Sequence, residues 1–230
     1  MSITRADTIT CRCGAAQTVE VVESLNAVRH PHLRARVLDR TLHAYPCPAC
    51  GAISIVEAAF LFVDLERGQL LGVHPAGSRG DADRLGRELV TIFEQRLRDH
   101  APAFVRARAR DCLVRICFGA EELREKLVAD DAGVDDLALE AAKADLLATT
   151  PTLGAAGVVT LVLDEVRDDR LVLIALGLDG RPHAAVLEVE RRHVDELAGR
   201  HAEILARLPA LAAGPHVSLL RLGMVVPGRE

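Results

Sequence analysis

Cys11-Arg12-Cys13-Gly14 and Cys47-Pro48-Ala49-Cys50-Gly51 are the two stretches that decide the fold of this chain. Each places two thiols close together and follows the second with a glycine, which lets the backbone turn tightly beside a bound ion. The two pairs lie about 35 residues apart, a spacing typical of a zinc ribbon with an insert between its two metal-binding turns. We therefore predict one structural Zn²⁺ held by Cys11, Cys13, Cys47 and Cys50.

Three alternatives to this four-cysteine site stay open. The first pair has one residue between its cysteines where a zinc knuckle has two, so His43 is a candidate substitute ligand. The cysteines could instead be small buried residues, or Cys47 and Cys50 could form a redox pair. A thioredoxin-like motif is followed directly by a helix, whereas residues 53–56 predict a strand. The predicted strand favours metal binding.

Two further cysteines, Cys112 and Cys117, lie in an apolar run that predicts a mostly buried strand. Residues five apart on a strand point to opposite faces of the sheet, so these two thiols cannot hold one ion together. We expect both to be small buried residues.

Composition bounds the class of protein. The chain has 230 residues, of which 50% are hydrophobic and 27% charged, with a net charge of −5. These values are typical of a folded protein. The longest apolar runs span about eight residues, too short for a membrane helix of about 20, and the N-terminus lacks the pattern of a signal peptide. We therefore expect a cytoplasmic protein with reduced cysteines and no membrane partner.

Charge and aromatic content argue against nucleic-acid binding. Basic surfaces and stacking aromatic rings are the usual means of binding DNA or RNA. Here acidic residues outnumber basic ones by ten to four over residues 111–151, and the chain has one Tyr, five Phe and no Trp. Arg106, Arg108 and Arg110 alternate with alanine, and we interpret them as a solvated edge, with a basic anion-binding patch as the alternative.

The periodicity of apolar residues predicts an α+β fold. Residues 1–75 form a zinc-ribbon-like β module with an inserted helix, and residues 76–150 form a mainly helical middle segment. A linker over 149–157 leads to a C-terminal antiparallel meander plus helix. We predict two domains, 1–150 and 151–230. The predicted strands cover residues 8–11, 18–25, 52–65, 70–74, 112–118, 158–166, 171–178, 182–189 and 219–226.

Helices are predicted between these strands from capping residues and apolar stripes. Acidic residues at Asp81 or Asp83, at Glu121 and at Asp135 suit helix N-termini. The predicted helices cover residues 31–40, 81–97, 121–133, 135–148 and 190–208.

Several residues resemble the CpXC domain family, a prokaryotic family with paired cysteine motifs and no characterised reaction. The resemblance covers roughly residues 7–150 and is carried by both cysteine stretches, by Pro31-His32-Leu33-Arg34, and by segments 38–43, 118–127 and 131–136. Arg12 stands alone between the first two cysteines, a departure from the pattern C-P-x-C. The resemblance implies metal binding at Cys47 and Cys50 and supplies no reaction.

No nucleotide-binding, zincin or nucleophile-elbow motif occurs in the sequence. Four thiolates also close the coordination shell of zinc, whereas a catalytic zinc keeps one position open. We therefore expect a zinc-stabilised protein-binding or adaptor protein, whose partner is another protein or a second copy of the chain. The alternatives are a metal-dependent hydrolase or nuclease-like enzyme that uses the acids Asp130, Asp131, Asp135 and Asp136, or a thiol redox protein that uses Cys47 and Cys50.

Overall fold

The computed structural model describes residues 2–177 and 182–223 and has the predicted α+β fold. Its internal contacts divide the chain into two compact units, Met1–Arg124 and Glu125–Glu230. This division differs from the predicted boundary at residue 150, because helix α5 (Asp136–Thr149) buries apolar side chains among residues of the C-terminal sheet. The assignment of independently folding domains stays a prediction.

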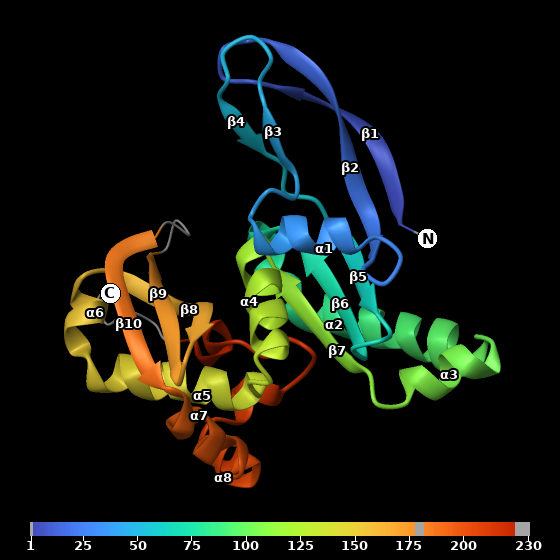
Figure 1. Cartoon of the computed structure of the whole chain (residues 1–230). Helices are drawn as coiled ribbons and strands as arrows, with labels where there is room; N and C mark the ends of the chain where they lie inside the picture. Colours follow the sequence, from blue (N-terminus) through green and yellow to red (C-terminus); the bar gives the residue numbers. More distant parts are fainter. Residues whose placement is uncertain (1, 178–181, 224–230) are drawn as a thin grey trace. The chain divides into compact units, whose positions relative to one another are not determined.

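The first unit is built on a five-stranded sheet with the strand order β1-β2-β5-β6-β7 (Figure 1). Strands β1 and β2 form the predicted antiparallel hairpin. Strand β2 joins the rest of the sheet through Ser24–Asn26, which pair in parallel with Leu61–Val63. The outer part of the hairpin therefore extends beyond the sheet. The strands are β1 (Ile3–Thr10), β2 (Ala16–Asn26), β5 (Phe60–Asp64), β6 (Gln69–His74) and β7 (Leu113–Phe118).

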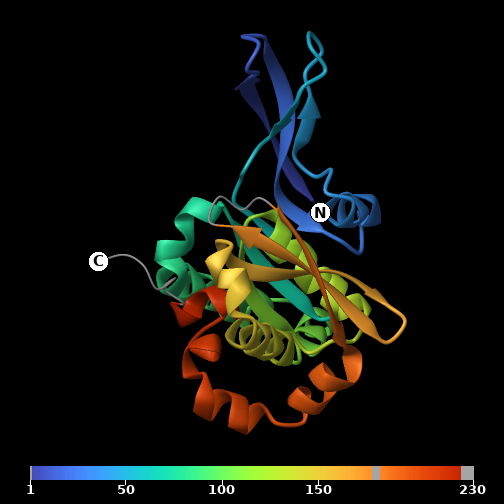
Figure 2. The same ribbon diagram turned by 90° about the vertical axis from the view of Figure 1, so that its left-hand side faces the viewer.

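A second, short hairpin lies beside the extended part of the first (Figures 1 and 2). It consists of β3 (Ala44–Pro46) and β4 (Ile53–Ile55) and follows helix α1 (Pro31–Leu38), the predicted inserted helix. The prediction of one strand over 52–65 is wrong, because β4 pairs with β3 while β5 pairs with β2 and β6. The two ends of that stretch thus belong to different sheets. We call residues 3–22 and 44–55 the arm.

Helices between β6 and β7 cover the sheet of the first unit. Leu89 and Phe93 of α2 pack with Leu70, Ile116 and Phe118 of the sheet in one apolar cluster. Asp81 precedes α2 as predicted, but its carboxylate pairs with Arg84 and caps no backbone group. The elements are η1 (Ala76–Asp81), α2 (Ala82–Phe93), the π-helical η2 (Glu94–Asp99) and α3 (Ala103–Ala109).

The second unit contains the predicted antiparallel meander, with the order β10-β9-β8. Helix α4 (Ala120–Asp131) leads into this unit, and α5 lies between the sheet and helices α7 and α8 (Figures 1 and 2). Apolar residues of α5 belong to two clusters, one shared with the strands and one shared with α8. The remaining elements are β8 (Val158–Arg167), β9 (Arg170–Gly177), β10 (Pro182–Glu190), α7 (Arg191–Ala198) and α8 (His201–Arg207).

Three predictions for the C-terminal part need correction. The predicted linker contains a short helix, α6 (Pro151–Ala155). Pro151 lies in its first turn, where a missing backbone N–H is tolerated. The predicted helix over 190–208 is two helices, because the chain breaks at Gly199 and Arg200. Residues Leu219–Leu222 form a 3₁₀ turn, η4, where a strand was predicted. Residues 224–226 of that predicted strand, and the predicted turn at 179–180, lie outside the described residues.

Candidate metal centre

The two cysteine pairs lie in the turns of the two hairpins of the arm. Cys11 directly follows β1 and Cys13 lies in the turn to β2, while Cys47 follows β3 and Cys50 lies in the turn to β4. Both turns are at the outer end of the arm (Figure 1). The fold thereby brings together cysteines that are 39 and 34 positions apart in the sequence.

The four sulfur atoms have the spacing of a zinc–thiolate site. The Cys11 Sγ lies 3.6 Å from the Cys50 Sγ, and the Cys13 Sγ lies 3.7 Å from the Cys47 Sγ. All four atoms are within 4.8 Å of one another. A tetrahedral Zn²⁺ with Zn–S bonds of about 2.3 Å requires S···S separations of about 3.8 Å, whereas a disulfide bond is about 2.05 Å. The donor set and its spacing therefore fit zinc.

Glycine makes both turns possible. Gly14 and Gly51 have φ angles of 88° and 73°, in the left-handed region that other residues rarely adopt. The Gly14 amide donates to the Cys11 carbonyl and the Gly51 amide donates to the Cys47 carbonyl, each at 2.8 Å. Each turn is thus closed by a backbone hydrogen bond across the cysteine pair.

The second turn also sets the charge of its thiols. The backbone amides of Ala49 and Cys50 donate toward the sulfur of Cys47 and lower the pKa of this thiol to about 7. The amide of Ala52 acts in the same direction on Cys50, but the neighbouring thiols and desolvation outweigh it and raise the pKa of Cys50 to about 12. Amides directed at a thiolate stabilise it as a metal ligand.

His43 is not a substitute ligand in this structure. Its Nε2 accepts a hydrogen bond from the backbone amide of Val22 at 2.9 Å, and its ring contacts the edge of Phe60. Burial, with smaller contributions from Arg36 and Arg5, lowers the pKa of His43 to about 4. The imidazole is therefore neutral and ties the β3–β4 hairpin to β2 at the base of the arm.

The other cysteines lie apart from this centre. Cys117 is fully buried in β7, as predicted, whereas Cys112 is half-buried just before that strand. Burial raises the pKa of the Cys112 thiol to about 11. Neither belongs to the cluster of metal-ligating groups found among the described residues.

The acids of the alternative hydrolase site have structural contacts. The Asp135 carboxylate caps α5 by accepting from the Ala138 amide at 2.8 Å, and it contacts His201 Nε2 at 2.9 Å. Asp136 lies 3.5 Å from the ammonium of Lys126. Asp135 thus begins a helix, as predicted, and Asp136 takes part in an ion pair.

The second unit contains a buried ionic cluster that we did not predict from the sequence. The Lys143 ammonium contacts Glu125 at 3.0 and 3.1 Å and Glu140 at 2.7 Å. Glu125 also accepts from the Leu163 amide, and Glu140 from the Leu219 amide, each at 2.6 Å. The cluster thus joins α4 and α5 to β8 and η4.

The sequence contains a signal for this cluster. Lys126 and Lys143 are the two lysines of a chain that otherwise uses arginine, and they lie on consecutive helices. Helix α5 is apolar on most faces, and a helix that is hydrophobic all round is buried. Its charged residues therefore had to be buried and paired.

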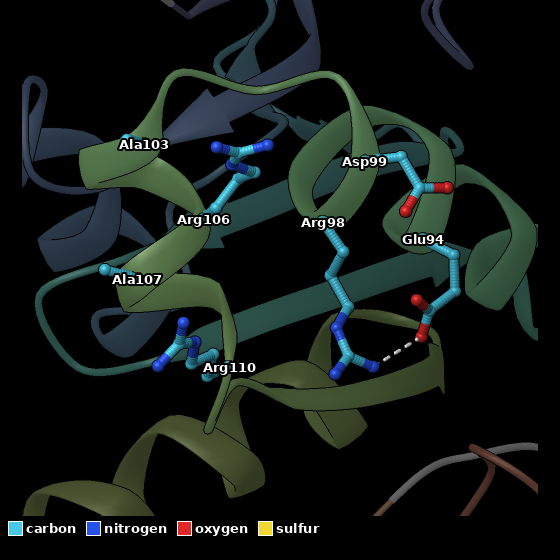
Figure 3. Close-up of a pocket in the computed structure, with 7 residues that line it drawn as sticks. All are labelled: Glu94, Arg98, Asp99, Ala103, Arg106, Ala107 and Arg110. Atoms are coloured by element: carbon cyan, nitrogen blue, oxygen red, sulfur yellow. Dashed lines mark hydrogen bonds and ion pairs between the residues drawn. The ribbon is translucent and has the colours of Figure 1, made fainter.

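Arg106 and Arg108, which we interpreted together with Arg110 as a solvated edge, lie on helix α3, and Arg110 is the residue that follows this helix. Arg106 and Arg110, one turn apart, line an open cavity of about 600 Å³ between α3 and η2, together with Arg98 (Figure 3). Arg98 is paired with Glu94 at 2.9 Å. Arg106 and Arg110 are exposed, so the solvated interpretation fits their surroundings.

Fold and site together define an α+β protein whose two hairpins present a four-cysteine cluster. A sequence model described as CpXC protein matches residues 9–143, more than half of the chain, and the chain belongs to this family. The comparisons with curated proteins and with solved structures gave no match. Within residues 2–177 and 182–223, every helix is too short or too polar to cross a bilayer.

Proposed function

We propose that this chain is a cytoplasmic protein-binding or adaptor protein whose binding element, the arm, is held in shape by one structural Zn²⁺. Cys11, Cys13, Cys47 and Cys50 would hold the ion, and their thiolates would complete its coordination. The ion would join two hairpins that have few side chains to bury against each other. Thiolate ligands persist in a reducing compartment, which supports a cytoplasmic location.

The observation that carries the proposal is a pair of exposed isoleucines beside the cysteine cluster. Ile53 and Ile55 on β4 are 68% and 73% exposed. They are two residues apart on one strand and so share a face. In the part of the chain that the structure describes, β4 pairs with β3 alone, so its outer edge offers free backbone groups. An apolar, unpaired edge strand is a template for a strand of another protein.

The two enzyme alternatives have weaker support. Strand β4 follows the Cys47–Cys50 turn directly, where a thioredoxin-like site has a helix. The Cys47 side chain is buried, whereas reactive thiols are accessible. The capping and pairing contacts of Asp135 and Asp136 leave the hydrolase alternative without an assembled acidic site in the described residues.

The test compares three forms of the full chain, each affinity-purified from the native host and analysed by mass spectrometry. They are the wild type, the double variant Ile53→Glu/Ile55→Glu, and the control Ile92→Glu, which alters an isoleucine that is 48% exposed on α2. We expect the wild type and the control to retain the same stoichiometric partner and the double variant to lose it. Zinc content should be equal in all three.

Light scattering of the same samples identifies a second copy of the chain as the partner. Retention of the partner by the double variant would contradict a role for β4. A protein that purifies alone and monomeric and turns over a substrate would rule out the adaptor function.

A further inference from the structure

A cavity of about 210 Å³ lies at the base of the arm, inside the first unit. Its walls come from α1 and the segment that follows it, from the stretch between β4 and the start of β5, from β6, and from the first turn of α4. Most of these walls are apolar, and they include Val37, Leu42, Phe60, Val73 and Leu123. Apolar concavities with a few converging polar groups are the usual form of a small-molecule site.

His43 supplies one of these polar groups. The ring is 4% exposed, and because Nε2 accepts from the Val22 amide, the neutral imidazole carries its proton on Nδ1. In the described part of the chain the ring makes no second hydrogen bond. His43 lines the cavity. The cavity therefore offers a hydrogen-bond donor to a molecule that carries an acceptor.

The first turn of α4 supplies further donors. Gly119, Ala120 and Glu121 line the same cavity at the start of a twelve-residue helix, whose first amides have no acceptor within the helix. The Gly119 amide donates to the His74 carbonyl, and Glu121 is paired with Arg40 at 2.9 Å. The amides of Ala120 and Glu121 and the positive end of the helix dipole thus favour an oxygen acceptor.

We propose that this cavity binds a small, mainly apolar molecule that carries a carboxylate or carbonyl oxygen at one end. The oxygen accepts from His43 and the α4 amides, and the apolar body contacts Val37, Phe60 and Val73. At about 30 Å³ for each water, the cavity has room for about seven waters. This volume suits a ligand of about seven to ten non-hydrogen atoms.

The probes are hexanoate and hexanamide, with hexylamine as the counterpart that lacks an acceptor oxygen. Binding to the zinc-loaded full chain is measured by titration of amide chemical shifts in NMR. We expect hexanoate or hexanamide to shift the resonances of Ala120, Glu121 and Val73, and hexylamine to leave them unchanged. If neither acceptor probe shifts these resonances, or if hexylamine binds equally well, the proposal is wrong.

A matched pair of variants locates the site. Ala58 lines the cavity and Ala59 does not, so Ala58→Phe should abolish binding while Ala59→Phe preserves it. His43→Met keeps a weak sulfur acceptor for the Val22 amide and has no side-chain donor, and we expect it to weaken binding about tenfold. Equal binding by the two phenylalanine variants would overturn the assignment. The variants' zinc content and far-UV circular dichroism verify that each is folded.

Discussion

Replacing Lys143 by methionine tests whether the buried ionic cluster holds the second unit together. Lys143 is 1% exposed and contacts two carboxylates that are equally buried. Its removal leaves Glu125 and Glu140 without their nearest cation, since the Lys126 ammonium is 3.8 Å from Glu140. Removing one partner from a buried ion pair costs about 3–5 kcal/mol. This is a large part of the about 5–15 kcal/mol that stabilises a typical domain.

The assay is urea and thermal unfolding followed by far-UV circular dichroism, because the chain has no tryptophan to report on this unit. A loss of about 3–5 kcal/mol corresponds to a decrease in Tm of about 12–20 °C for a unit of about 100 residues. The control is Arg207→Met, which removes an exposed arginine that contacts Asp145 at 3.1 Å in the same unit. An exposed pair contributes about 0–1 kcal/mol, so the control should change Tm little.

The pH dependence of this variant checks the mechanism. Burial raises the pKa of Glu140, and Lys143 opposes this rise in the wild type. Without Lys143, Glu140 takes up a proton more readily, so the deficit in stability should be smaller at pH 5 than at pH 8. A Lys143→Met protein that loses no more stability than the Arg207→Met control, at either pH, would refute the reasoning.

Purified protein should contain about one zinc per chain, and Cys13→Ser or Cys47→Ser should lose the metal and lower the Tm, as metal analysis and calorimetry would show; full zinc content and unchanged stability in Cys47→Ser would exclude the site. Gly51→Ala places a side chain at a φ of 73° and should lower the free energy of unfolding in urea by about 1 kcal/mol. An unchanged free energy of unfolding would show that this turn does not need glycine. The pKa of His43 is about 4 in the folded chain against an ordinary 6.5. The stability that the neutral imidazole contributes is therefore complete above pH 6.5 and is lost as the pH falls toward 4. After allowance for solvent screening this amounts to about 2 kcal/mol, and His43→Gln should flatten the stability profile over that range; an unchanged profile would show that His43 is not the titrating group.

Local sequence patterns determined much of this protein. The paired cysteines and their glycines predicted the two tight turns that bring the four thiols together, because such a turn needs a backbone conformation that glycine allows. Alternation and turn residues predicted the C-terminal meander, and Asp135 predicted the start of α5. Family membership followed from the same motifs.

Tertiary structure decided what depends on pairing between distant segments. The stretch 52–65 is mostly apolar and predicts one strand, but its halves pair with different partners, because an apolar pattern carries no information about which strand is the partner. His43 has the spacing of a metal ligand, yet its ring accepts from an amide 21 residues away. Helix α5 is apolar on most faces, so its sequence indicates that Glu140 and Lys143 are buried. The partners of these charges depend on how whole elements pack, so only the folded chain shows that Lys143 pairs with Glu125 of α4 as well as with Glu140.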